Sequence, residues 1–267
     1  MSYTNFYPSS GMFHASLPLL MGTRIDVLLF GDDGLQLENV WKRMEKEART
    51  LEKMLNRFDP ASEVSKVNDN AHLATIQLSD ELWEIMLDCR RYYEQTDGYF
   101  DVAKTTFDKI VFVDDLHGIL FVNNGMTLDF GGYAKGYALK CMRKQLEEAG
   151  ISRALINFGN SSVLALGGHP YGDSWPVSID DPSDGKALPT IYLCNESLSV
   201  SGNSPSREGH IINPKTAEPV TGEQMVAVIA EDPVEAEALS TAWIASGYND
   251  CPEWMKNFNL NKKYRIK

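Results

Sequence analysis

The chain of 267 residues has few of the features that mark a metal cluster, a disulfide scaffold or a membrane protein. Its four cysteines lie far apart, and no CxxC motif or Cys/His cluster occurs. Zinc binding is therefore not indicated, and Cys89 and Cys141 are better interpreted as buried free thiols than as a disulfide. No apolar run is long enough to cross a bilayer, so we expect no transmembrane segment.

Positive charge is also scarce. Lysine and arginine number 25 against 37 aspartates and glutamates, which gives a net charge of −12 and a sequence pI of about 4.9. A nucleic-acid partner is not expected, because a phosphate backbone demands a basic surface. The surplus of carboxylates instead leaves oxygen ligands for a divalent cation.

The N-terminal segment lacks lysine and arginine up to Arg24. A secretory signal begins with a charged segment, so residues 1–23 do not have the form of one. We expect a cytoplasmic protein from the sequence as written, or a periplasmic protein or lipoprotein if a leader has been removed.

Strand patterns outnumber helix patterns, and runs of consecutive strands follow each helix. This order predicts an α+β fold with an antiparallel sheet packed with helices. Residues 1–20 are expected to form an extended arm, 21–256 a single domain or two intimate lobes, and 257–267 a tail. Helices are predicted at 35–57, 62–68, 80–95, 134–149 and 233–247. Strands are predicted at 24–30, 75–78, 110–113, 119–122, 126–130, 153–158, 162–166, 175–179, 189–193, 197–200 and 225–230.

The stretch 128–146 combines the end of an apolar strand, two glycines and an amphipathic helix. Gly131 and Gly132 allow the backbone to approach a ligand closely, and the free N–H groups of the first helical turn favour an anion. Lys135 adds positive charge there, and Asp129 supplies a carboxylate. The alternative is a plain packing joint between a strand and a helix. The glycines do not fit G-x-G-x-x-G, which argues against a dinucleotide fold of that kind.

Oxygen ligands recur near the C-terminal end. Glu237 and Thr241 are four residues apart on the last predicted helix and share a face. With a backbone carbonyl near Gly132 they would suit Mg²⁺, whose shell is often completed by substrate phosphates. The alternative is an ordinary helix face, with Glu237 solvated and Thr241 bonded to its own turn.

Two further candidates for catalysis are weaker. His210 follows a polar segment and could serve as a general base or bind a phosphate, although a structural histidine is the commoner outcome. Several serines lie between residues 197 and 206, but no G-x-S-x-G motif accompanies them, which favours a loop over a hydrolase site.

Several separated segments resemble, in the same order, motifs of the FAD:protein FMN transferase (ApbE-type) family. They are Met21-Gly22-Thr23, Phe58-Asp59, Ser62-Glu63-Val64-Ser65-Lys66-Val67-Asn68, Gly98-Tyr99-Phe100-Asp101-Val102, Leu128-Asp129-Phe130-Gly131-Gly132-Tyr133-Ala134-Lys135-Gly136-Tyr137-Ala138, Ile156-Asn157-Phe158-Gly159, His210-Ile211-Ile212-Asn213-Pro214-Lys215-Thr216 and Ala236-Glu237-Ala238-Leu239-Ser240-Thr241-Ala242. The resemblance implies a T-fold-like α+β architecture. It also implies an enzyme that binds FAD and Mg²⁺, cleaves the pyrophosphate and transfers FMN to a Thr or Ser hydroxyl of an acceptor protein.

The resemblance also implies roles for individual residues. The carbonyl of Gly132, Glu237 and Thr241 correspond to metal ligands, and His210 and Lys135 to catalytic groups beside the phosphates. The positions that line the FAD site correspond to Met21, Phe58, Tyr99, Phe100, Asp101, Asp129, Lys135 and Ile211.

The chain departs from the family pattern at a few positions. The family usually has Asp at Glu237, Gly at Asn160 and Asp at Ser161, and often Asp at Lys140, Asp at Asn213 and Gly at Ala217. The departures at Asn160, Ser161 and Glu237 leave a non-catalytic flavin-binding protein as one alternative. A second alternative is an FAD pyrophosphatase that makes FMN and AMP, with water in place of the acceptor hydroxyl. The acceptor pattern Ser/Thr-Gly-Ala-Ser/Thr does not occur in this chain.

Overall fold

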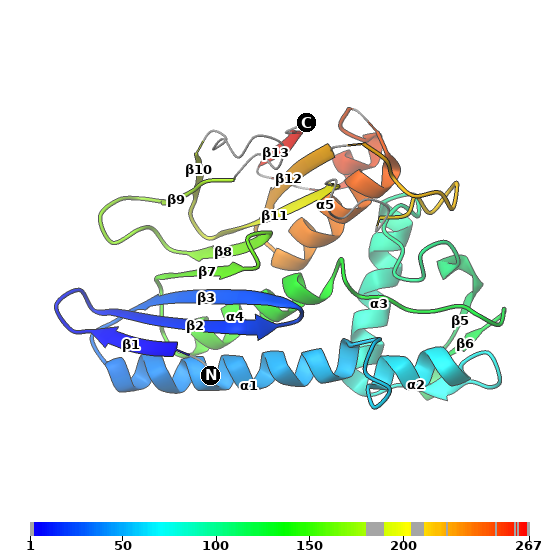
Figure 1. The fold of residues 1–267 in the computed structure, drawn as a ribbon, viewed down its shortest axis with the longest axis horizontal. Coiled ribbons are helices and arrows are strands. Elements are labelled where there is room, and N and C mark those ends of the chain that lie inside the picture. Colours follow the sequence, from blue (N-terminus) through cyan, green and yellow to red (C-terminus); the bar gives the residue numbers. More distant parts are fainter. Residues whose placement is uncertain are drawn as a thin grey trace.

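A large antiparallel sheet forms the centre of the molecule (Figure 1). The computed structural model describes residues 3–179, 190–203, 211–222, 224–248, 250–258, 260 and 262–265. In this part of the chain the sheet has eight strands in the order β1-β2-β3-β7-β8-β11-β12-β13. Their bounds are β1 Tyr3–Tyr7, β2 Met12–Leu20, β3 Thr23–Phe30, β7 Ala154–Phe158, β8 Ser162–Leu166, β11 Glu196–Asn203, β12 Gln224–Ala230 and β13 Lys262–Arg265.

Three helices form one layer against this sheet. They are α1 (Gly34–Leu55), α4 (Ala134–Glu148) and α5 (Pro233–Ser246), and contacts run from α1 to α4 and from α4 to α5. Alternate residues of β3, namely Ile25, Val27 and Leu29, are buried under α1 and α4, as the two-residue period of a strand requires. The short pair β9 (Trp175–Val177) and β10 (Ile191–Leu193) packs on the other face of β8, β11 and β12.

A second lobe is inserted between α1 and α4 (Figure 1). It contains α2 (Glu63–Asn70), α3 (Asp80–Gln95) and the small sheet β4-β6-β5, formed by Ile76–Gln77, Gly118–Phe121 and Ile110–Val113. The lobe also contains two short 3₁₀ turns, η1 (Phe107–Lys109) and η2 (Asp114–Leu116). A further 3₁₀ turn, η4 (Glu253–Asn257), follows α5. The core of this lobe is continuous with the inner side of α5, so the two lobes meet along that helix.

The helix boundaries follow from capping side chains. Ser79 accepts a hydrogen bond from the N–H of Leu82 at the start of α3. Asp232 does the same for Val234 at the start of α5, where Pro233 occupies the first turn. Both caps satisfy N–H groups that the helix itself leaves unpaired, and both confirm the starts predicted from the sequence. Within the described part of the chain, no helix has the length and apolarity that crossing a bilayer requires.

The two ends of the chain are more regular than the sequence suggested. The prediction of an extended arm over 1–20 is wrong for the part that the structure describes, because β1 and β2 pair with each other and β2 pairs with β3. Phe13, Ala15 and Leu17 alternate into the core, a pattern that the neighbouring Ser and Pro residues obscure. The expected tail likewise supplies β13, which pairs with β12.

One predicted strand is absent from the sheets, and one predicted hairpin pairs differently. Residues 126–130 are irregular, because the side chain of Asn68 bonds both the N–H and the carbonyl of Leu128 and takes the place of a partner strand. The hairpin expected from 189–193 and 197–200 does not form either. Instead β10 pairs with β9, while β11 pairs with β8 and β12. The α+β class with an antiparallel sheet is confirmed.

The crossing of α4 and α5 depends on a glycine. A Cβ atom at Gly136 would lie 2.7 Å from the carbonyl oxygen of Pro233 and 3.0 Å from the Cβ of Glu237. Since the obstruction includes backbone, it cannot be relieved by a rotamer change. Gly136 therefore sets how closely the first turn of α4 approaches α5.

We expect Gly136→Ala to lower the free energy of unfolding by about 1–3 kcal/mol, because the added methyl group must push the two helices apart. Urea unfolding followed by circular dichroism measures this change. Gly172→Ala is the matched control, since a Cβ at Gly172 meets nothing within 4 Å, and it should change stability by less than about 0.5 kcal/mol. Equal effects of the two substitutions would show that the crossing tolerates a wider spacing.

Candidate functional site

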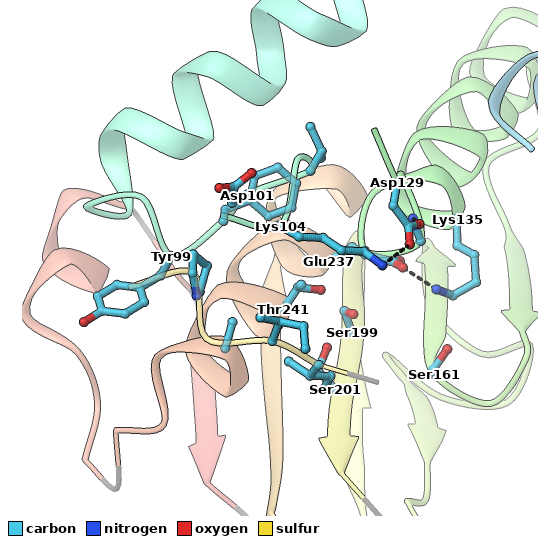
Figure 2. A pocket seen from close by; sticks show the side chains of 18 of the residues that line it. Tyr99, Asp101, Lys104, Asp129, Lys135, Ser161, Ser199, Ser201, Glu237 and Thr241 are labelled. Atoms are coloured by element: carbon cyan, nitrogen blue, oxygen red, sulfur yellow. Dashed lines mark hydrogen bonds and ion pairs between the residues drawn. The ribbon is translucent and has the colours of Figure 1, made fainter. Parts of the chain in front are cut away.

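A pocket of about 600 Å³ lies where the two lobes meet. Its walls come from α5, the start of α4, the loop that precedes α4, the segment after α3 and strand β11 (Figure 2). These elements are far apart in the sequence, so the pocket depends on the complete fold. Most of the residues that the sequence singled out lie in this lining, namely Tyr99, Phe100, Asp101, Asp129, Gly132, Lys135, Ile211, Glu237 and Thr241.

Gly132 brings the predicted metal ligands into one wall. A Cβ atom at this position would lie 2.7 Å from Cγ2 and 2.8 Å from Oγ1 of Thr241. Any other residue at this position would therefore force the side chain of Thr241 to shift. Thr241 and Glu237 are one helical turn apart on α5, and both line the pocket beside the Gly132 peptide.

Glu237 is a buried carboxylate with two partners. Its side chain is 4% exposed. The ammonium of Lys135 forms an ion pair with Oε1 (Figure 2), and the hydroxyl of Ser162 donates to Oε2 over 2.8 Å. A buried charge of this kind is stable only when it is paired and hydrogen-bonded. The alternative of an ordinary helix face with Glu237 in solvent is therefore wrong.

A row of serine hydroxyls lies between the sheet and α5. The register of β8 and β11 places Ser162 opposite Ser199. The Oγ atom of Ser240 on α5 is 2.9 Å from that of Ser199 and 2.8 Å from that of Ser201. Ser199 lies in the strand that the sequence predicted at 197–200. The interpretation of the serines as a loop is wrong for Ser201, because β11 extends to Asn203, and both side chains line the pocket.

Asp129 is held by two cations and one backbone group. Its Oδ2 atom lies 2.9 Å from Nε of Arg57 and 3.3 Å from Nζ of Lys104. Its Oδ1 atom accepts the N–H of Gly131 over 3.0 Å, which fixes the turn before α4. The sequence analysis missed Arg57 and Lys104. Arg57 precedes the motif residue Phe58, and Lys104 comes two residues after the segment that ends at Val102.

Asp101 closes a turn at the opposite wall. Its carboxylate accepts the N–H of Ala103 over 2.6 Å and that of Phe107 over 3.4 Å. Burial raises the pKa of Asp101 to about 6, against an ordinary value of 3.8. Nearby, burial and a hydrogen bond with Tyr248 raise the pKa of Tyr99 to about 12, and the two phenolic oxygens are 2.8 Å apart.

Two predicted flavin-binding residues lie outside the pocket lining. The N–H of Met21 donates to the carboxylate of Glu52 over 2.6 Å, and its side chain packs against the sheet core. The ring of Phe58 is 78% exposed, with the guanidinium of Arg57 4.3 Å from its centre. His210, predicted to be catalytic, lies outside the described residues.

The departures from the family pattern have local consequences. Asn160 adopts φ 58°, which asparagine tolerates better than most residues, and its N–H donates to the side chain of Asn157 over 3.0 Å. Asn160 does not line the pocket, whereas Ser161 does. Ala217 adopts φ 60°, a conformation that glycine would take without strain. Lys140 forms an ion pair with Asp232 over 2.8 Å.

The pocket offers oxygen atoms rather than a preformed metal cluster. Among the residues that the structure describes, no three His, Cys, Asp or Glu side chains are grouped to hold a metal ion. The candidate ligands are one carboxylate, one hydroxyl and one carbonyl, at Glu237, Thr241 and Gly132. Such a set fits Mg²⁺, which takes few protein ligands and completes its shell with water and phosphate oxygens.

Fold and site together define an α+β protein with an ion-paired pocket at the start of a helix. The ApbE family model matches residues 21–111 and 102–264, and the chain belongs to the ApbE family. Among similar proteins, the FAD:protein FMN transferase of Rhodobacter capsulatus is 34% identical over 152 residues, which is 54% of this chain and 29% of that protein. The one from Salmonella typhimurium is 22% identical over 283 residues, which is 90% of this chain and 80% of that protein.

Solved structures share the fold. The flavin transferase ApbE from Vibrio cholerae superposes with a TM-score of 0.83 at 16% identity, over 96% of this chain and 97% of that chain. The ApbE protein from Thermotoga maritima gives a TM-score of 0.80 at 21% identity, over 89% and 88% of the two chains.

Lys135→Met should lower the free energy of unfolding by about 3 kcal/mol, because it leaves the buried carboxylate of Glu237 without its cation. Thermal or urea unfolding measures the change. Lys140→Met is the control on the same helix, since its ion pair with Asp232 is exposed and should contribute less than about 1 kcal/mol. The double variant Lys135→Met/Glu237→Gln should recover much of the loss. A Lys135 variant as stable as the Lys140 variant would contradict this assignment.

Asp101 should make stability depend on pH. Since its folded pKa of about 6 exceeds the ordinary value, its contribution to stability is fully present below about pH 4 and is lost as the pH rises through 6. We expect the unfolding free energy of the wild type, minus that of Asp101→Asn, to fall by about 2–3 kcal/mol between about pH 4 and pH 7. A difference that stays constant over this range would argue that Asp101 titrates normally.

Proposed function

We propose that this chain is a flavin transferase that moves FMN from FAD to a threonine or serine hydroxyl of an acceptor protein, in a reaction that requires Mg²⁺. The observation that carries the proposal is the single pocket wall formed by Gly132, Lys135, Glu237 and Thr241, in a chain of the ApbE family. The similar proteins from Rhodobacter capsulatus and Salmonella typhimurium bear the name FAD:protein FMN transferase.

The residues of the pocket suit a phosphate-containing ligand. The first turn of α4 presents backbone N–H groups, and the ammonium of Lys135, which is paired with Glu237, lies at the same place. The carboxylate of Glu237, the hydroxyl of Thr241 and the carbonyl of Gly132 would hold Mg²⁺, which supplies charge stabilisation for the transferring phosphoryl group. The aromatic face of Tyr99 offers a surface on which a ring of the ligand can stack.

The proposed reaction exchanges the phosphoanhydride bond of FAD for a phosphoester bond to the acceptor. The acceptor hydroxyl oxygen forms a bond to the phosphorus of the FMN half, and the bond from that phosphorus to the bridging oxygen breaks. AMP leaves with that oxygen, and the hydroxyl proton passes to a base, the role that we propose for His210. Asp101 lines the same pocket, where its backbone hydrogen bonds hold the segment that carries Tyr99.

The test is to incubate the protein with FAD, MgCl₂ and a peptide that contains Ser/Thr-Gly-Ala-Ser/Thr. Flavin fluorescence on the peptide and chromatography of the nucleotides report the products. We expect covalent FMN and equimolar AMP, with EDTA abolishing and excess Mg²⁺ restoring the reaction. Glu237→Ala and Thr241→Ala should each reduce the rate by about 100-fold or more, as expected when a phosphoryl charge loses its stabilising group.

Thr50→Ala is the matched control, because this exposed hydroxyl of α1 bonds only its own helix. It should leave the rate unchanged. AMP and FMN without a modified peptide would instead identify a pyrophosphatase, and binding of intact FAD would identify a flavin-binding protein without catalysis. A wild type that does not bind FAD at all would overturn the proposal.

A further inference from the structure

The trio of Arg57, Asp129 and Lys104 carries more positive charge than its carboxylate neutralises. Both cations contact the same oxygen, Oδ2 of Asp129, and its Oδ1 is already bonded to the N–H of Gly131. One carboxylate cannot balance two cations, so the trio has a formal charge of about +1. All three side chains line the pocket. A local positive charge in a chain of net charge −12 calls for an anionic ligand.

Arg57 has unused hydrogen-bond donors. Its Nε atom is buried and has no hydrogen-bond partner, since the contact with Asp129 is ionic only. Within the part of the chain that the structure describes, the side chain of Arg57 makes no hydrogen bond. The ring of Phe58 covers one face of the guanidinium and restricts its orientation. A planar fork of donors that is held in place but unpaired suits the oxygens of a phosphate.

Lys104 reaches the trio from an unusual backbone conformation. Its φ angle is 66°, in the left-handed region that a lysine rarely adopts. The hydrogen bond from its N–H to the carbonyl of Asp101 holds this turn, and its side chain extends to Asp129 (Figure 2). Glycine would take the same conformation without strain. A strained lysine at the pocket wall therefore points to a use for its ammonium.

We propose that Arg57 and Lys104 form a clamp for the phosphate oxygens of the flavin dinucleotide, and that Asp129 is the positioning residue that holds both cations. The inference rests on the proposed function. It assigns the part of the pocket lined by Arg57, Lys104 and Asp129 to the diphosphate of the ligand. Among the described lining residues the cationic side chains are Arg57, Lys104 and Lys135, and the last is already paired with the buried carboxylate of Glu237. The trio thus supplies the positive charge that remains for a ligand with two phosphates.

The experiment compares FAD with riboflavin, which carries the same ring system but no phosphate. Wild type, Arg57→Gln, Lys104→Gln and the double variant are titrated with each ligand, followed by fluorescence quenching at low and high NaCl. Each single substitution should weaken FAD binding by about tenfold, the scale of one lost charge-assisted hydrogen bond. Riboflavin binding should stay unchanged, and the salt dependence of FAD binding should become smaller. Lys109→Gln, which removes an exposed cation outside the lining, is the control and should bind FAD as the wild type does.

A second variant separates ligand binding from folding. Lys104→Gly relieves the left-handed strain, so its unfolding midpoint should equal or exceed that of the wild type while FAD binding still weakens about tenfold. A structural role for Lys104 would instead lower the midpoint. Arg57→Lys keeps the positive charge but loses the planar pair of N–H donors that can bind two phosphate oxygens. Its affinity for FAD should therefore lie between those of the wild type and Arg57→Gln.

The outcomes distinguish the clamp from the proposed function. If the wild type binds FAD and Arg57→Gln, Lys104→Gln and the double variant leave that affinity unchanged, the clamp is overturned and the flavin function stands. An equal loss for riboflavin and FAD also overturns it, because the cations would then shape the ring site rather than bind phosphate. A wild type that binds neither ligand overturns the proposed function and the clamp with it.

Discussion

The close approach of α4 to α5 at Gly136 is the contact on which the pocket depends. Because no side chain separates the two helices there, Lys135 on one helix can reach Glu237 on the other. The same crossing leaves Gly132 against Thr241. Because Gly132 and Gly136 have no side chain, the backbone of this segment lies directly against α5. This close contact brings charged and hydroxyl groups together in a region that would otherwise be an apolar core. The sheet and the caps of the helices keep this arrangement rigid.

The second organising feature is the balance of charge inside the pocket. The negative charge of Glu237 is neutralised by Lys135. The two cations beside Asp129 carry more charge than its carboxylate neutralises. The remaining carboxylate, Asp101, bonds backbone N–H groups and has a raised pKa because it is buried. The acidic character of the whole chain therefore does not extend into this pocket. A site that is neutral to slightly positive can accept an anion that the rest of the surface would repel.

The sequence predicted the helices and the sheet class, and most of the site residues that it singled out lie in the pocket lining. Helical periodicity and caps such as Ser79 are local signals, and the motif order identified residues as distant as Tyr99 and Thr241. What it missed depends on tertiary contacts. The alternation of β2 is obscured by the serine and proline residues in and before the strand. The strand expected near Leu128 loses its partner to one side chain of Asn68. Arg57 and Lys104 are forty-seven positions apart and share no sequence pattern. Only the fold shows that both contact the carboxylate of Asp129 and can bind the same ligand.

The insertion of the second lobe between α1 and α4 has a consequence for how the molecule is made. Strand β3 cannot pair with β7 until the whole second lobe has been synthesised, because β7 follows that lobe in the sequence. The candidate metal ligands on α5, Glu237 and Thr241, are synthesised later still. Pairings of such long range are slow to form and leave strand edges open meanwhile. During synthesis the pocket does not exist until the last helix has emerged, so its ligands cannot assist earlier folding. Folding of the nascent chain is therefore driven by its apolar cores alone, and the substrate can bind and stabilise only the completed fold.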